Sequence, residues 1–430
     1  MRRRSILRLA RTGLAAGVLC ASALTQAQSP GPRPVWAEEP LTLGRCVELA
    51  LQDGLTVQAL RARVQAAEAA VTTAQTPPNP VFTYTAQDLG LVTPSGLALL
   101  HQQALSLPIL AAYTRQKEAQ VVRAALAQVS ASAAEERRQL RRAVGRAYLD
   151  AVLAERLAEL DARAERLAAE LIGQATRRMQ HGEAGAIEIT RAHAEALDVQ
   201  RSAQGSRRRS EQARLALSTW LGAELPFLVR LAVAPTSPVV PVVQEAAPSE
   251  AAQDPQDPSA RADLVAAQAA VARAARQVEL EARRQLPLAD LQLVAGARES
   301  AAGVGGLLAL SVPVPLWDHN RGPLRLARAQ LEGARAEHAL RTRQVALELA
   351  STERERQGTR DVLDQLARPL VPLREQALRA AQRQFAEGLV PLLEVITAQR
   401  DLLQAERALA QAERDAAVAE WELRIARAAD

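Results

Sequence analysis

Apolar residues recur at coiled-coil spacing in two long stretches of the chain. In the first stretch, about 114–180, steps of three and four residues run through Leu153, Leu157, Leu160, Ala164, Leu167 and Leu171. The second stretch continues the same steps through Leu363, Leu366, Leu370, Leu373, Ala377 and Ala380. This 3.5-residue period is typical of helices that supercoil around one another. It predicts two long helices, the second interrupted near residue 368 because Pro369 and Pro372 cannot continue a regular helix.

The lengths of the helical segments predict how they are arranged. A helix over 114–180 spans roughly 100 Å at 1.5 Å per residue. The following segment, 187–221, has about half of that length, and the opening helix, 43–75, has about the other half. Two shorter helices stacked end to end beside one long helix would form a long, straight wall. A plain coiled coil would show the same heptad stripe without this arrangement.

Short segments between the helices alternate apolar and polar residues as strands do. In 288–295 the apolar face holds Ala289, Leu291, Leu293 and Ala295, opposite Asp290 and Gln292. In 306–313 it holds Leu308, Leu310 and Val312, opposite Ala309 and Ser311. Segments 80–88 and 97–107 take the same part earlier in the chain, with His101 and Gln103 in the second, and 89–96 and 297–305 are predicted turns.

Strands of this kind suit a transmembrane β-barrel, although two small soluble hairpins would show the same alternation. A four-stranded sheet leaves open edges, which lipid does not tolerate. If the sheet lies in a membrane, other subunits must therefore complete it, and three copies would give twelve strands.

The chain also repeats itself at a spacing of roughly 205 residues. Leu105-Ser106-Leu107-Pro108-Ile109 returns as Leu310-Ser311-Val312-Pro313-Val314, and Ile187-Glu188-Ile189-Thr190 is echoed by Leu393-Glu394-Val395-Ile396. Such self-similarity predicts a duplicated unit. We expect one repeat over 41–222 and a second over 260–430, joined by a linker at 223–259 that is rich in Pro, Val, Ser and Ala.

Composition and charge narrow the class of protein. The chain is 48% hydrophobic but only 2% aromatic, which favours long, closely packed helices over a large globular core. The net charge of +5 equals the charge of Arg2, Arg3, Arg4, Arg8 and Arg11, all within residues 1–27, which contain no acid. These residues have the basic start, apolar stretch and small-residue end of a secretory signal. We expect cleavage near Ala27, with lipidation at Cys20 as the alternative, and a mature chain of net charge 5 − 5 = 0 that does not bind nucleic acid.

No catalytic or metal-binding pattern stands out. The five histidines, His101, His181, His193, His319 and His338, are scattered without cysteines or carboxylates at ligand spacing. There is no phosphate-binding glycine loop and no nucleophile motif. We therefore expect a conduit or interaction protein that is not an enzyme and carries no cofactor.

The chain resembles the outer-membrane efflux proteins, the TolC family, over essentially its whole mature length. The resemblance is carried by Leu41-Thr42-Leu43 to Ala50-Leu51, by Ala62 to Ala69, by Asn79-Pro80, and by Ser311-Val312-Pro313-Val314-Pro315-Leu316-Trp317-Asp318-His319-Asn320-Arg321-Gly322. The last segment is most similar to the CzcC-like, cation-efflux branch of the family.

The resemblance implies a mainly α-helical chain with a small β part. Three chains would form a twelve-stranded outer-membrane barrel, with four strands from each chain, continued by a long coiled-coil tunnel into the periplasm. The homotrimer would contact outer-membrane lipid, a periplasmic adaptor (a membrane-fusion protein) and an inner-membrane pump of the RND type. It would serve as the passive exit duct for heavy-metal cations. A multidrug or type I secretion duct and a periplasmic coiled-coil adaptor are the alternatives.

The resemblance also assigns roles to residues at the turns between the long helices. Gly388, Leu389 and Val390 match the family's periplasmic tip, which contacts the adaptor, and Gly182 and Gly185 belong to a looser first-repeat version. Glu394 falls where the family places an acidic ring at the constriction, and Glu188 is its counterpart. Phe385 and Val390 replace a gate-locking Tyr and an Arg, so opening is expected to depend on apolar packing at Phe385.

Overall fold

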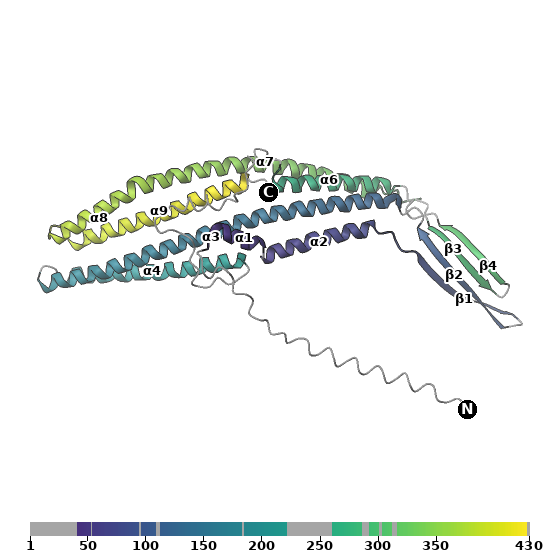
Figure 1. Cartoon of the computed structure of the whole chain (residues 1–430), viewed down its shortest axis with the longest axis horizontal. Helices are drawn as coiled ribbons and strands as arrows, with labels where there is room; N and C mark the ends of the chain where they lie inside the picture. Colours follow the sequence, from purple (N-terminus) through teal and green to yellow (C-terminus); the bar gives the residue numbers. More distant parts are fainter. Residues whose placement is uncertain are drawn as a thin grey trace, which may run out of the picture.

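The computed structural model describes residues 41–427, apart from 53, 94–95, 109–111, 183–184, 222–259, 286–291, 301–302 and 312–315. The predicted signal segment 1–27 and linker 223–259 lie outside the described residues. The chain forms a long, gently curved stack of helices with a small sheet at one end (Figure 1). No helix in the described ranges is long and apolar enough to cross a membrane.

The described elements run in the same order twice. The first half contains α1 (Leu43–Gln52), α2 (Leu55–Gln75), β1 (Val81–Thr93), β2 (Gly96–Pro108), α3 (Ala112–Gln180) and α4 (Ala186–Leu221). The second half contains α6 (Ala262–Arg283), β3 (Gln292–Ser300), β4 (Gly303–Ser311), α7 (Arg321–Gln365), the π-helix η4 (Leu366–Leu370), α8 (Val371–Ala386) and α9 (Leu392–Arg427). Each half thus consists of opening helix, hairpin, long helix and return helix.

The short helices stack along the long ones, as their lengths predict. In the first half α2 and α4 lie along the two ends of α3, with α1 between them against α3 and α4 (Figure 1). In the second half α6 and α9 take the same places along the helical line of α7, η4 and α8. Both α6 and α9 also contact α3, so the two halves form one wall.

The predicted interruption near residue 368 is confirmed as the π-helix η4. Pro369 lies inside it, and its ring nitrogen has no hydrogen to donate to the helix. The helix widens here, and the N–H of Val371 donates to the carbonyl of Leu366, five residues earlier.

The extra residue of the π-helix shifts the buried face of α8. The predicted heptad stripe is wrong beyond this point, because Leu373 is 59% exposed and Ala377 is also exposed. Leu378 and Phe385 are buried instead. A heptad period that is extended through the prolines does not account for the extra residue, which rotates the buried face of the helix that follows.

The four strands form one antiparallel sheet in the order β1-β2-β3-β4. Leu293 lies opposite Leu310 and Ala295 opposite Leu308, so the predicted apolar positions of these two strands share one face. The other face is mixed: it carries Val294 and Leu307 as well as polar residues, and Ser106 donates to Gln292 across it at 3.1 Å. β1 and β2 are longer than predicted, and β3 and β4 reach further toward their shared turn, where Gly303, Gly305 and Gly306 still pair through their backbones. Most of the predicted turn residues 89–96 and 297–305 therefore lie in strands.

Two apolar clusters hold the helices together. One lies where α1 meets α3, α4 and α9 and includes Tyr148, whose hydroxyl donates to the carbonyl of Leu41 at 3.0 Å. The other lies near the free ends of the α3–α4 and α8–α9 hairpins. Buried polar contacts also join the helices, and they are described below.

Candidate functional site

Both helical hairpins turn at a left-handed glycine at the end far from the sheet. The backbone φ is 76° at Gly182 and 75° at Gly388, a conformation that favours glycine. At the second turn the N–H of Gly388 donates to the carbonyl of Phe385 at 3.0 Å, and that of Leu389 donates to Gln384 at 2.8 Å. These are the two hydrogen bonds of a Schellman helix end. The N–H of Gly182 makes the corresponding bond to Met179 at 3.0 Å.

The two hairpin tips pack against each other around Phe385. This side chain is 6% exposed and joins an apolar cluster drawn from α3, α4, α8 and α9, namely Leu171, Ala175, Ala192, Leu378, Phe385, Leu392, Val395 and Ile396. From α3, the guanidinium of Arg178 lies 4.5 Å from the centre of the Phe385 ring. Arg178 also donates to the Phe385 carbonyl at 3.3 Å. Phe385 therefore joins the second hairpin to the first.

The two acidic residues singled out in the sequence occupy the first turns of the return helices. Glu394 is exposed near the start of α9, and its N–H donates to the Pro391 carbonyl at 3.1 Å. Glu188 is half-buried near the start of α4, and one of its carboxylate oxygens is buried without a hydrogen-bond partner. A carboxylate is stabilised at this end of a helix by the helix dipole.

The remaining tip candidates differ in their exposure. Leu389 is 71% exposed, and Gly185 and Gly388 are exposed as well. Val390 packs against the apolar tip cluster. Ile187 is 63% exposed and Leu393 46%, so apolar surface from both hairpins surrounds the turns.

A buried polar link that the sequence did not predict lies further up the hairpins. Asp161 of α3 is 2% exposed and accepts from Arg407 of α9, whose Nε lies 3.0 Å from the carboxylate. Ser202 and Ser206 of α4 donate to the same carboxylate, and Arg407 donates to Ser202 at 2.8 Å. Arg407 lies about 15 residues into α9, roughly 23 Å from the tip at 1.5 Å per residue. This link joins α3, α4 and α9 at about the level of the π-helix, which α9 contacts.

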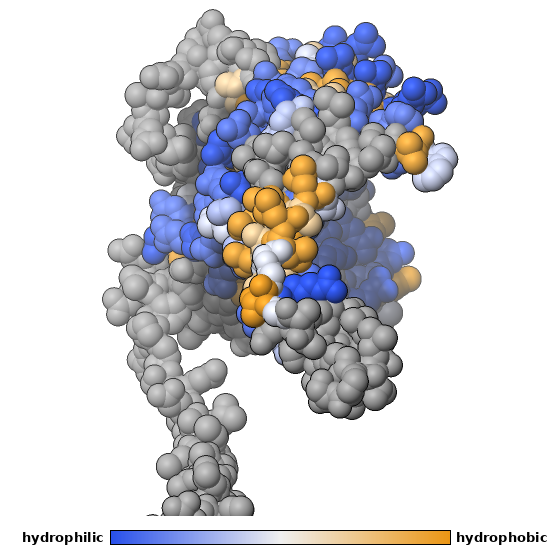
Figure 2. All heavy atoms as spheres, turned by 90° about the vertical axis from the view of Figure 1, so that its right-hand side faces the viewer, coloured by the Kyte–Doolittle hydropathy of each residue, from blue (hydrophilic) through white to orange (hydrophobic). Residues whose placement is uncertain are grey.

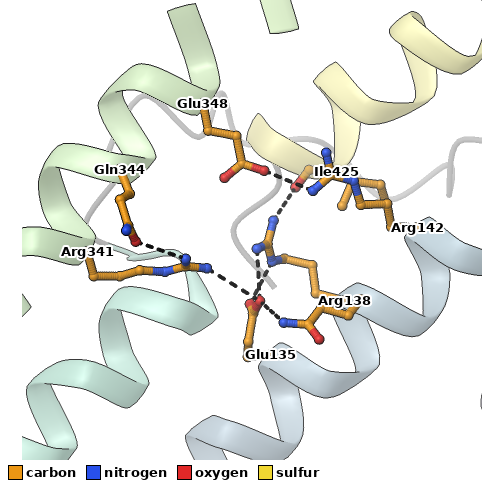
Figure 3. Close-up of a pocket in the computed structure, with 8 residues that line it drawn as sticks. Glu135, Arg138, Arg142, Arg341, Gln344, Glu348 and Ile425 are labelled. Carbon is orange, nitrogen blue, oxygen red and sulfur yellow. Dashed lines mark hydrogen bonds and ion pairs between the residues drawn. The ribbon is translucent and has the colours of Figure 1, made fainter. Parts of the chain in front are cut away.

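A second charged cluster surrounds a cavity of about 390 Å³ midway along the wall. It forms where α6 begins and α9 ends, since both occupy the space between α3 and α7. Figure 3 shows how side chains from α3 and α7 close the gap. The lining residues are Glu135, Arg138, Gln139, Arg142, Arg341, Gln344, Glu348 and Ile425.

Two arginines cap the last turn of α9 at this junction. Arg261 donates to the carbonyl of Ala426 at 3.0 Å, and Arg138 donates to that of Ile425 at 3.5 Å. Positive charge at a helix C-terminus is stabilising. Arg261 is 1% exposed and also pairs with Asp263 and Glu348, each at 2.9 Å.

The balance of charge at the junction keeps Asp263 and Glu348 ionised. Burial by itself would raise the pKa of Asp263, but the hydrogen bond and charge of Arg261, with the charges of Arg138 and Arg341, outweigh it and lower the pKa. The pKa of Glu348 is lowered in the same way, against burial, by Arg261, Arg142 and Arg138. The junction is therefore a set of matched ion pairs, and within the described residues no group of three or more His, Cys, Asp or Glu could hold a metal ion.

Replacing Phe385 with leucine tests the tip contact. The change keeps an apolar side chain of similar size but removes the ring that faces Arg178, so we expect a loss of about 1 kcal/mol. The measurement is the melting temperature of the detergent-solubilised protein, followed by the loss of helical circular dichroism. Leu389→Ala, at an exposed position of the same tip, is the matched control and should melt like the wild type. Equal melting of both variants would show that the ring contact contributes nothing.

Comparisons with known proteins agree with this architecture. Residues 259–427 match the family model of the outer membrane efflux proteins. The chain is 24% identical over 380 residues, covering 86% of this chain and 87% of the relative, to the cobalt-zinc-cadmium resistance protein CzcC of Cupriavidus metallidurans. Its structure is similar to that of the channel protein CusC, with a TM-score of 0.75, 15% identity and coverage of 90% of this chain and 92% of the other. VceC of Vibrio cholerae gives a TM-score of 0.71 at 19% identity, with coverage of 90% and 95%.

The fold is that of the TolC-like channels, in which a small sheet continues into long helices. The chain matches the outer membrane efflux protein family over residues 259–427. It is a non-enzymatic conduit of the outer membrane that extends into the periplasm.

Proposed function

We propose that three copies of this chain form the exit duct of a tripartite efflux system and pass heavy-metal cations to the outside. The observation that carries the proposal is the sheet, which gathers most of its large apolar side chains on one face and has two unpaired edges in the described residues. The long helical wall begins directly beside it (Figure 1).

The exposed face of the sheet supports its placement in lipid. Val304 and Leu308 are each 75% exposed, Phe82 is 65% and Leu310 is 61%. By register, these residues share one face with Leu105, Leu107 and Leu293. Figure 2 shows apolar residues gathered over this end of the molecule. A patch of this kind is rare on soluble monomers and suits contact with a membrane.

The edges of the sheet support a homotrimer. Within the described sheet, β1 and β4 each pair on one side only. Because lipid cannot satisfy their free N–H and C=O groups, β4 of one copy would pair with β1 of the next. Three copies would close a barrel of twelve strands with the face of Ser106 and Gln292 inside, and their helices would continue it as a tunnel.

The tips support a gate and a docking surface. Three copies of Glu394 around one axis would form a ring that attracts cations, and Glu188 would add a second ring. Packing at Phe385 would keep the tips closed. The exposed Leu389, Ile187 and Leu393 give an apolar surface for a periplasmic adaptor, which would connect the duct to an RND-type inner-membrane pump.

The cation substrate is supported by the relative CzcC, which is named for resistance to cobalt, zinc and cadmium. A strain that lacks this chain should become sensitive to these cations and recover when the chain is returned on a plasmid. Sensitivity to antibiotics with unchanged metal tolerance would favour a multidrug duct. The duct itself is tested by membrane fractionation and by the mass of the detergent-solubilised protein. A soluble monomer would contradict it.

Replacing Glu394 with glutamine tests the acidic ring. The substitution keeps the size of the side chain and removes three negative charges from the trimer. We expect the cation-to-anion permeability ratio in planar bilayers to fall at least about twofold at low salt, where screening is weak. Glu332→Gln, at an exposed position of α7 far from the tip, is the control and should leave the ratio unchanged. Identical ratios in both variants would rule out the ring.

A further inference from the structure

The segment that leads into α7 exposes a tryptophan almost completely. Trp317 is 90% exposed, more than any other exposed large apolar side chain of the described residues, and its neighbour Leu316 is 63% exposed. Tryptophan is highly buried on average in folded proteins, so such exposure suggests a partner for the ring.

Hydrogen bonds hold this segment in place. Asn320 has a left-handed backbone with a φ of 54°, and its N–H donates to the carboxylate of Asp318 at 2.9 Å. Its side-chain amide donates to both the carbonyl and the carboxylate of Glu281 at the end of α6, each at 2.8 Å. Glu281 is 6% exposed, which makes it a buried anchor. Trp317 lies next to this anchored turn, so its exposure is a feature of the fold.

Trp317 and Leu316 follow the strand whose apolar face is the most exposed. The even-numbered positions of β4 place Val304, Leu308 and Leu310 on that face. In the sequence the same alternation continues through Val312, Val314 and Leu316. Because β4 ends at Ser311 and α7 begins at Arg321, the pair lies at the end of the sheet that joins the helices.

The first half of the chain covers its aromatic residue at the corresponding place. Tyr113, at the start of α3, is half-buried, and the guanidinium of Arg283 lies 5.0 Å from the centre of its ring. Trp317, just before α7, has no such cover among the described side chains. The difference makes Trp317 the side chain available to an outside partner.

We propose that Leu316 and Trp317 anchor each copy in the headgroup layer of the periplasmic leaflet of the outer membrane. An indole ring has an apolar body and one N–H donor, which suits the boundary between hydrocarbon and water. Leu316, which is 63% exposed, adds an apolar side chain that would reach the hydrocarbon beside it. The inference rests on the proposed function, because it requires the sheet to lie in the membrane.

The test uses the purified full chain in phospholipid vesicles whose acyl chains carry bromine near the headgroup. Bromine quenches a tryptophan only at close range, and the chain has four tryptophans, Trp36, Trp220, Trp317 and Trp421. We expect the wild type to lose emission in brominated vesicles relative to plain ones. This loss should disappear in Trp317→Leu and persist in Trp220→Leu, the control on α4. If Trp317→Leu does not insert, Trp317→Tyr serves in its place.

Two outcomes would overturn the anchor. Equal quenching in the wild type and Trp317→Leu would place the ring away from the lipid. If the emission of Trp317 is quenched neither by brominated lipid nor by aqueous iodide, a second copy of the chain covers the ring. The mass and fractionation of the same wild-type sample separate this failure from that of the proposed function. A membrane-inserted trimer without quenching of Trp317 contradicts the anchor alone.

Discussion

Replacing Arg261 with methionine is expected to destabilise the protein by about 3 kcal/mol. Methionine fills the space of the arginine stem but leaves the buried carboxylate of Asp263 without its principal partner. The carbonyl of Ala426 at the end of α9 would also lose its donor. The expected loss is at the lower end for a broken buried pair because Arg341 still lies 2.9 Å from Asp263.

The melting temperature of the detergent-solubilised protein measures this effect. Arg328→Met, at an exposed position of α7, is the matched control and should melt like the wild type. Adding Asp263→Leu to Arg261→Met should recover part of the loss, since it removes the unpaired charge. If Arg261→Met and Arg328→Met have the same melting temperature, the junction does not hold the wall together.

The pH dependence of the same variant has a definite sign. Because the folded-state pKa of Asp263 is lowered, its ion pairs stabilise the protein above the ordinary aspartate pKa of about 3.9. That contribution disappears as the pH falls through the folded-state value. The difference in melting temperature between the wild type and Arg261→Met should therefore narrow below about pH 4.

Replacing Asp161 with asparagine is expected to cost roughly 2–3 kcal/mol and to loosen the hairpin tips. The substitution keeps the shape of the side chain but leaves Arg407 without a counter-charge in a link that joins α3, α4 and α9. Arg407 is 34% exposed, so water offsets part of the cost. The link holds α3, α4 and α9 together just beyond the tip contacts. Its loss should loosen the closed tips and so raise the ion leak through the closed duct.

Melting temperature and bilayer conductance are both measured for this variant. The control is Asp150→Asn, which breaks a surface link between α3 and α9, the two helices that Asp161 and Arg407 also join. Asp150 is 49% exposed and pairs with Arg414, whose Nε lies 2.8 Å away. We expect Asp150→Asn to change stability by less than about 1 kcal/mol. If Asp161→Asn behaves like it in both measurements, the buried link has no special part in holding the tips.

Much of the fold follows from local periodicity. Strand alternation identified the shared face of Leu293 and Leu310, which the register confirms. Helix lengths predicted the end-to-end stacking, and prolines predicted the interruption near residue 368. These features depend on neighbouring residues, so one sequence is enough to reveal them.

The polar links could not be predicted in this way. Arg261 pairs with Glu348, 87 residues later, and Arg407 pairs with Asp161, 246 residues earlier. In a chain with 53 Lys and Arg and 48 Asp and Glu, no local pattern marks these pairs among the many exposed ones. The π-helix also moved the buried face of α8 from Leu373 to Leu378, because one added residue rotates everything that follows it.

The sequence by itself determined the helices and the amphipathic strands, and its resemblance to a known family pointed to the glycine turns and to an efflux duct. Each of these rests on the period of side chains along the chain or on motifs a few residues long. Only the tertiary structure decided which charged residues are buried as partners, which face of α8 packs, and that Trp317 stands exposed beside an anchored turn. Those outcomes depend on how distant helices meet, because burial and charge pairing are properties of the packed wall.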